Sequence, residues 1–165
     1  MRREEVIFVP PVTESVWITN FAWDDLLRPS RLTDREYLES CMERLADQEG
    51  FTTIPEYRIA PEGESAGADW YFRNAWIDVD FKVDMAKARE IHMFNIRNAR
   101  NAELADLDVP FMQAVEANDR DELARISSLK QTLRDIPQTI DLFTGISTPA
   151  NLKAKWPVGL RRNSD

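Results

Sequence analysis

The feature that most constrains this chain is a run of 61 positions, residues 84–144, that contains no glycine and only two prolines. Glycine and proline are the residues least tolerated inside helices, so a long run with so few of them favours helix. We predict two helices, Met85 to about Leu107 and Asp121 to about Ile136. A shorter apolar turn or helix, Val109–Asn118, is expected to join them.

Both predicted helices carry an apolar stripe. Asp84 is a suitable N-cap for the first helix, on which one face would hold Met85, Ala88, His92, Ile96 and Ala99. The second helix repeats apolar residues at intervals of three and four, at Leu123, Ile126, Leu129, Leu133 and Ile136. Such a stripe can be buried within its own helix pair, against a partner protein, or against a second copy of the chain, and the pattern leaves all three open.

The region before residue 84 contains short candidate strands. Val6–Val9 is a β-branched run that stops at two prolines, which predicts a strand at a sheet edge or at the chain terminus. Val16–Thr19 is a second candidate strand. Phe21–Arg28 is compatible with a helical turn.

A helix is expected between these strands and the next. Thr33 and Glu36 have the spacing of a capping box, in which each side chain accepts a hydrogen bond from the backbone N–H of the other residue. The helix would run from Asp34 to about Gln48 and stop at Gly50.

Three further segments complete this region. Ile54–Ala60 is predicted to be extended. The aromatic run Trp70–Ile77 suits a strand that packs on both faces or a surface patch that contacts a partner. Asp78–Val83 alternates charged and apolar residues, which is typical of a half-buried strand. The predicted fold is therefore α+β, with a small β-rich domain of mixed structure over residues 1–83 and a helical hairpin or arm over residues 84–165.

Composition excludes several classes of function. The net charge is −8 and the isoelectric point is about 4.8, which argues against nucleic-acid binding and against binding an anionic membrane surface. No apolar run approaches the length needed to cross a bilayer. We therefore expect the protein to work in a reducing cytoplasm, or to leave the cell as part of a larger particle.

Residues that could carry chemistry are few. With one cysteine, Cys41, and one histidine, His92, no site made of several thiolates and imidazoles can be built. We expect Cys41 to be an inert buried thiol and His92 to be a packed, hydrogen-bonded core or interface residue. Asp78, Asp80 and Asp84 lack the glycine and glutamate positions of a calcium loop. No enzymatic activity, cofactor or metal is predicted.

The second half of the chain resembles the tail and tail-fibre assembly proteins of tailed bacteriophages, small proteins encoded beside tail-fibre genes. The resemblance covers roughly residues 57–157. It rests on an ordered series of short segments: Tyr57–Ile59, Phe72–Trp76, Asp84–Met93, Leu107–Met112, Lys130–Pro137, Thr148–Pro149 and Leu152–Pro157. The first fifty residues match nothing in that family and are a natural place for a part that selects the partner.

The resemblance implies a protein that docks onto phage tail or tail-fibre proteins, either as a transient assembly chaperone or as a minor subunit of the virion tail. It implies work in the host cytoplasm during assembly, with no cofactor and no catalytic residue. Seven residues are the predicted partner-binding set: Trp70, Phe72, Trp76, Leu123, Ile126, Leu129 and Leu133. An alternative hypothesis is a small carbohydrate- or peptide-binding module that uses Trp70, Tyr71 and Trp76 as a stacking platform.

Overall fold

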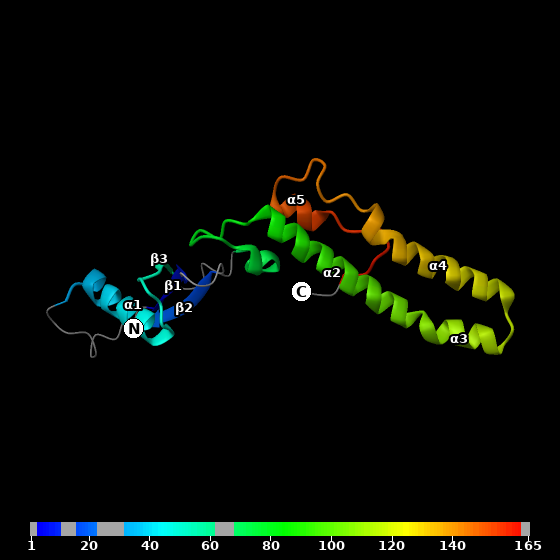
Figure 1. Cartoon of the computed structure of the whole chain (residues 1–165), viewed down its shortest axis with the longest axis horizontal. Coiled ribbons are helices and arrows are strands. Elements are labelled where there is room, and N and C mark those ends of the chain that lie inside the picture. Colours follow the sequence, from blue (N-terminus) through cyan, green and yellow to red (C-terminus); the bar gives the residue numbers. More distant parts are fainter. Residues whose placement is uncertain (1–2, 11–15, 23–31, 62–67, 163–165) are drawn as a thin grey trace. The chain divides into compact units, whose positions relative to one another are not determined.

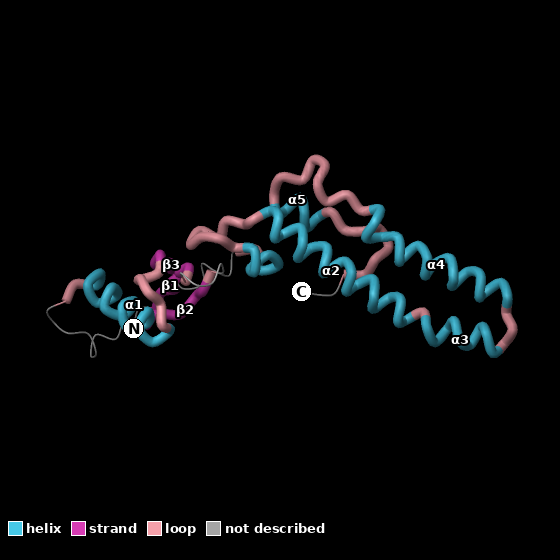
Figure 2. The backbone as a smooth tube through the Cα atoms, in the orientation of Figure 1, coloured by secondary structure: helices cyan, strands magenta, loops and turns pink. Residues whose placement is uncertain are grey.

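The computed structural model describes residues 3–10, 16–22, 32–61 and 68–162. The chain divides into two compact units, an N-terminal unit, Met1–Asp84, and a C-terminal unit, Met85–Asp165. The first contains a small sheet and one long helix, and the second is helical (Figures 1 and 2). The predicted α+β class is confirmed.

The sheet of the N-terminal unit has three antiparallel strands in the order β2-β1-β3. They are β1 (Arg3–Val9), β2 (Trp17–Ala22) and β3 (Glu56–Pro61). In the paired register Phe8 lies opposite Trp17 on one side and Tyr57 on the other. The β1 strand is therefore central in the sheet, so the edge alternative of its prediction is wrong, whereas the other alternative, a strand at the chain terminus, agrees with its range.

The apolar run of β1 is explained by burial on both faces of the sheet. Val6 and Phe8 pack with Leu38 and Met42 from the helix α1 (Asp34–Glu49). The intervening Ile7 is fully buried in a second cluster on the opposite face. A strand that buries both faces shows no alternation, and prolines that follow its last residue do not restrict its place in the sheet.

The boundaries of α1 agree with the sequence signals. Thr33 accepts a hydrogen bond from the backbone N–H of Glu36, and the Glu36 carboxylate accepts one from the backbone N–H of Thr33 at 2.7 Å. The Thr33 backbone N–H and the Thr33 hydroxyl, which also donates to the Glu36 carboxylate, lower the pKa of Glu36. Gly50 ends the helix in the left-handed conformation, with φ of 71°.

Thr33→Ala is expected to lower the free energy of unfolding of the N-terminal unit by about 1 kcal/mol, because it leaves helix N–H groups without their cap. Urea denaturation followed by circular dichroism measures the change. Thr33→Ser retains the hydroxyl and serves as the control. Equal loss in both variants would show that the hydroxyl does not cap α1.

The strand predicted over Asp78–Val83 is wrong, as are the strand alternative for Trp70–Ile77 and part of a predicted helical turn. Trp70–Ala75 is a short 3-10 helix, η2, capped by the Asp69 side chain, which accepts from the backbone N–H of Tyr71. Asp78–Val83 is a turn in which the Asp78 carboxylate accepts from the backbone N–H groups of residues 80 and 82. The helical turn expected over Phe21–Arg28 is wrong for Phe21 and Ala22, which belong to β2, and otherwise lies outside the described residues.

The C-terminal unit is a helical hairpin. Its first arm contains α2 (Met85–Asp106) and α3 (Asp108–Glu116), and its second arm is α4 (Arg120–Thr139), which returns beside them (Figure 1). A short helix, α5 (Pro149–Ala154), packs on α2. Thr148 caps α5 through its hydroxyl, which accepts from the backbone N–H of Asn151 at 3.2 Å.

The hairpin contains two prolines, and each lies inside a helix. Pro110 lies in the first turn of α3, where its missing N–H has no helical partner to lose. Pro137 was expected to end α4, but the helix continues to Thr139. Pro137 removes only the N–H that would donate to the Leu133 carbonyl, and the helical bonding resumes beyond it, where the Ile140 N–H and the Thr139 hydroxyl both donate to the Ile136 carbonyl.

Candidate functional site

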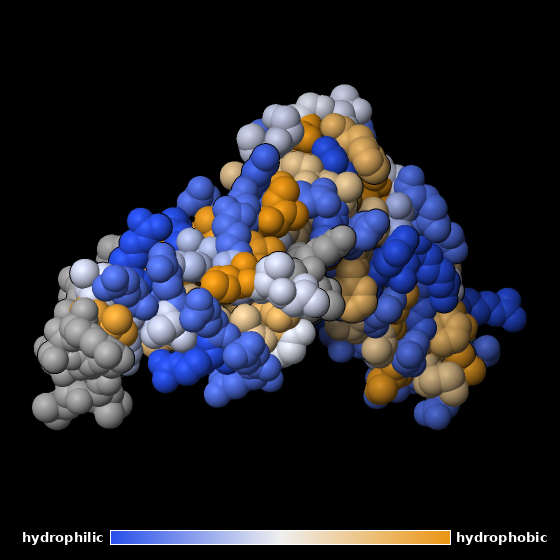
Figure 3. Space-filling view, turned by 60° about the vertical axis from the view of Figure 1, so that its left-hand side comes forward, coloured by the Kyte–Doolittle hydropathy of each residue, from blue (hydrophilic) through white to orange (hydrophobic). Residues whose placement is uncertain are grey.

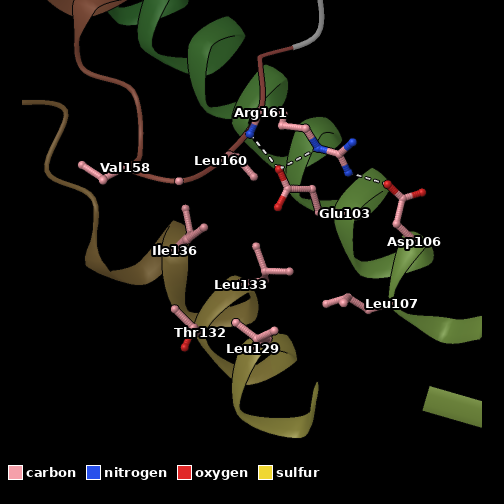
Figure 4. Close-up of a pocket in the computed structure, with 11 residues that line it drawn as sticks. Glu103, Asp106, Leu107, Leu129, Thr132, Leu133, Ile136, Val158, Leu160 and Arg161 are labelled. Atoms are coloured by element: carbon pink, nitrogen blue, oxygen red, sulfur yellow. Dashed lines mark hydrogen bonds and ion pairs between the residues drawn. The ribbon is translucent and has the colours of Figure 1, made fainter. Parts of the chain in front are cut away.

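An open groove lies between α2 and α4 and has a volume of about 360 Å³. We call it the α2–α4 groove. Its apolar lining comes from the end of α2, from α4 and from the segment that follows α5 (Figure 4). The apolar lining residues are Leu107, Leu129, Leu133, Ile136, Val158 and Leu160.

One wall of the α2–α4 groove is made by a turn near the end of the chain. Gly159 has φ of 83°, and the Leu160 N–H donates to the Pro157 carbonyl, which reverses the chain. Leu160 is 6 % exposed and packs on Ile96 and Ala99 of α2. The Trp156 indole N–H donates to the Leu160 carbonyl at 2.8 Å and holds the turn closed.

Ion pairs attach this segment to α2 at the rim of the groove. The backbone N–H of Arg161 donates to Glu103 at 2.7 Å, and the Arg161 guanidinium pairs with both Glu103 and Asp106 (Figure 4). The two carboxylates raise the pKa of Arg161. These contacts are exposed, so they orient the segment more than they stabilise it.

The groove presents apolar side chains to the solvent. Leu129 is 42 % exposed on α4 and Val158 is fully exposed at the tip of the turn, while Leu133 and Ile136 are half-buried between them. Hydrophobic side chains also reach the surface at several separate places on the face drawn in Figure 3. Open apolar side chains around a concavity are typical of a protein-binding surface.

The structure separates the four residues predicted on α4. Leu129 and Leu133 line the α2–α4 groove. Ile126 is fully buried in the C-terminal unit, and Leu123 is half-buried outside the groove lining. Ile126 is therefore a core residue rather than a contact for a partner.

The predicted aromatic residues lie in the N-terminal unit, and two of them belong to its core. Phe72 is fully buried and Trp76 is 2 % exposed, whereas Trp70 is 45 % exposed. Tyr71 is half-buried with its ring against Phe72. The arrangement follows from η2: positions 72 and 75 lie on the same side of a 3-10 helix, and that side faces the interior.

A second concavity of about 290 Å³ joins η2 to the start of β2. We call it the tryptophan pocket. Its aromatic lining is Trp17, Trp70 and Trp76, and its other lining residues are Val16, Ile18, Arg73 and Asn74. The flat platform of Trp70, Tyr71 and Trp76 is thus replaced by a pocket in which Trp17 takes the place of Tyr71.

His92 is fully buried on α2, as predicted for a core histidine. Its Nε2 lies 2.9 Å from the backbone oxygen of Lys155 and therefore carries the hydrogen that it donates. Trp156 meets the ring edge-on at a centroid distance of 5.6 Å. Burial lowers the pKa of His92, outweighing the bond to Lys155, and the nearby Arg162 lowers it further.

This lowered pKa predicts that the C-terminal unit loses stability as the pH falls below about 6.5, the ordinary value for histidine. There the unfolded chain takes up a proton that the folded unit excludes, so stability is complete above that value and declines below it. Urea denaturation at about pH 7.5 and pH 5.5 measures the loss. His92→Gln keeps a donor but does not titrate, so its loss should be smaller; an equal loss would contradict this assignment.

Among the described residues, no group of three His, Cys, Asp or Glu side chains is placed to hold a metal ion. Cys41 was expected to be buried, but it is half-buried and accepts a hydrogen bond from Arg44 at 3.0 Å. Asp80 pairs with Arg58 at 3.2 Å. The described helices include none that is long and apolar enough to cross a membrane.

Sequence patterns did not identify two residues of the groove, Leu160 and Arg161. Each is far along the chain from the α2 residues that it contacts. A signal was present for the turn, because Gly159 can supply the positive φ that the third residue of a type II turn requires. No signal in the sequence pairs Arg161 with Glu103. For the tryptophan pocket, Trp17, Arg73 and Asn74 were likewise missed, because they meet only through the fold.

We compared the chain with protein-family models, with curated proteins and with solved structures, and none of them matches it.

Proposed function

We propose that this protein acts in the assembly of a bacteriophage tail or tail fibre by docking an apolar segment of a tail protein in its α2–α4 groove. The observation that carries the proposal is the groove itself. It offers apolar side chains from three segments around an open volume of about 360 Å³, with Leu129 and Val158 exposed at its edges. The chemistry of such a lining suits an apolar helix or strand of a partner.

The resemblance to tail assembly proteins supports the same surface. The matching segment that lies on α4, Lys130–Pro137, contributes Thr132, Leu133 and Ile136 to the groove lining. A second matching segment contributes Leu107. A third ends at Pro157 and includes the Trp156 side chain that holds the groove wall in place. The proposed docking role therefore involves residues that carry the resemblance.

Co-expression with a phage tail-fibre protein tests the proposal. Leu129→Glu places a charge in the groove at an exposed position, so it should abolish any gain in fibre solubility or assembly while the chain stays folded. Ser127→Glu is the matched control, because residues two apart on a helix point to nearly opposite sides. If the wild-type chain changes neither solubility nor assembly of the fibre protein, the docking proposal is wrong.

Mass spectrometry of purified virions separates the two forms of the proposal. A minor tail subunit would be found in mature particles at a fixed ratio to the tail proteins. An assembly chaperone would be absent from the particles and present in the cell during assembly. Presence in the particle contradicts the chaperone form, and absence contradicts the subunit form.

A further inference from the structure

The tryptophan pocket combines exposed aromatic rings with polar side chains that make no hydrogen bonds to other described residues. Trp17 is 38 % exposed and Trp70 is 45 % exposed, and Trp76 is 2 % exposed beneath them. The Trp70 and Trp76 rings are 5.3 Å apart at 66°. Two tryptophans thus reach the surface beside a third that is held in the core.

The polar residues of this pocket are exposed and unengaged. In the part of the chain that the structure describes, neither the Arg73 guanidinium nor the Asn74 amide makes a hydrogen bond or ion pair, and the Trp17 indole N–H makes no hydrogen bond. All three groups can donate hydrogen bonds, and the Asn74 amide can also accept them. Arg73 and Asn74 follow Trp70 on η2, so one short element supplies both an aromatic face and planar polar groups.

We propose that the tryptophan pocket binds a neutral saccharide, with one pyranose ring stacked on Trp70 or Trp17 and its hydroxyl groups bonded to Arg73 and Asn74. The C–H face of a sugar ring packs on an indole, and its hydroxyls accept from and donate to guanidinium and amide groups. A volume of about 290 Å³ is near the low end for ligand pockets and suits one or two rings.

Charge and shape argue against the other common ligands of aromatic pockets. A cation, which tryptophan cages bind through the ring faces, would be repelled by Arg73. A nucleotide or other phosphate would meet a unit in which acidic residues outnumber basic ones about two to one. A proline-rich peptide needs a row of aromatic ridges along several residues, whereas this pocket is compact. Saccharide binding here uses the N-terminal unit and is independent of docking in the α2–α4 groove.

The test uses the full chain on an array of immobilised neutral oligosaccharides, followed by calorimetric titration with the best binder in solution. We expect saturable binding that weakens about tenfold or more in Trp70→Ala, through the lost stacking surface. Trp70→Phe should restore part of the affinity. Arg73→Gln should weaken binding severalfold without loss of stability, because Arg73 makes no contact that the fold needs.

Two controls keep the result specific. Phe143→Ala removes another aromatic ring, 72 % exposed in the C-terminal unit, and should leave binding unchanged. An octaproline peptide titrated into the same protein tests the peptide alternative. Binding of octaproline with no saccharide bound would overturn the proposal, as would an array without any bound oligosaccharide, or saccharide binding that Trp70→Ala and Arg73→Gln leave intact.

Discussion

Trp76→Ala is expected to lower the free energy of unfolding of the N-terminal unit by about 3–5 kcal/mol. Trp76 is 2 % exposed and packs against Phe81 at a ring centroid distance of 4.7 Å and against Trp70. Removing the indole leaves a cavity that the short η2 helix and the turn after it cannot refill. Since small domains are stable by only about 5–15 kcal/mol, this loss is large.

Denaturation in urea, followed by circular dichroism, measures the effect. The matched control is Ile77→Ala, the next residue along the chain, which is 44 % exposed and should change stability by about 0.5 kcal/mol or less. Equal effects of the two substitutions would mean that Trp76 is not a core residue. In that case the flat platform of Trp70, Tyr71 and Trp76 would again be the better description of this region.

Leu160→Ala is expected to lower the free energy of unfolding of the C-terminal unit by about 2–5 kcal/mol. Leu160 is 6 % exposed and packs on Ile96 and Ala99 of α2, with Leu133 and Ile136 of α4 beside it. It therefore closes the hairpin core from a segment about sixty residues away in the chain. The same substitution should loosen the wall of the α2–α4 groove.

Val158→Ala is the control for Leu160, because it lies two residues earlier in the same turn and is fully exposed. It should change stability by about 0.5 kcal/mol or less. Hydrogen exchange of the α2 amides adds a second measure, with faster exchange expected only in Leu160→Ala. Wild-type exchange and stability in Leu160→Ala would show that the segment after α5 does not complete the core.

Elements set by local signals were predictable from the sequence. The capping box at Thr33 and the left-handed Gly50 define α1, and the intervals of three and four residues define α4. His92 could be assigned to the core because its neighbours at helical spacing are apolar. Each of these signals acts within one or two helical turns, so it does not depend on the rest of the fold.

Elements set by long-range packing were not predictable. The central place of β1 depends on α1 covering one face of the sheet while Ala60 and Val79 pack on the other. The alternation of Asp78–Val83 imitates a strand, but the Asp78 carboxylate binds the backbone of a turn there, and Phe81 has a φ of 60°.

The two candidate sites depended on the same kind of long-range contact. Leu129 and Leu133 were found from their helical stripe, which is a local pattern. Leu160 and Arg161 join them only because the chain returns to α2 after α5. In the tryptophan pocket, Trp70 was found from its aromatic neighbours, but Trp17 reaches it only through β2.

Site-specific crosslinking distinguishes a groove that docks a tail-protein segment, as proposed, from one that does not. A photoreactive amino acid is placed at Leu129 or at Ser127, on nearly opposite sides of α4, during co-expression with a tail-fibre protein. If the proposal is right, position 129 forms a covalent adduct to the fibre protein and position 127 forms none. Equal adducts from both positions, or an adduct from position 127 alone, would contradict it.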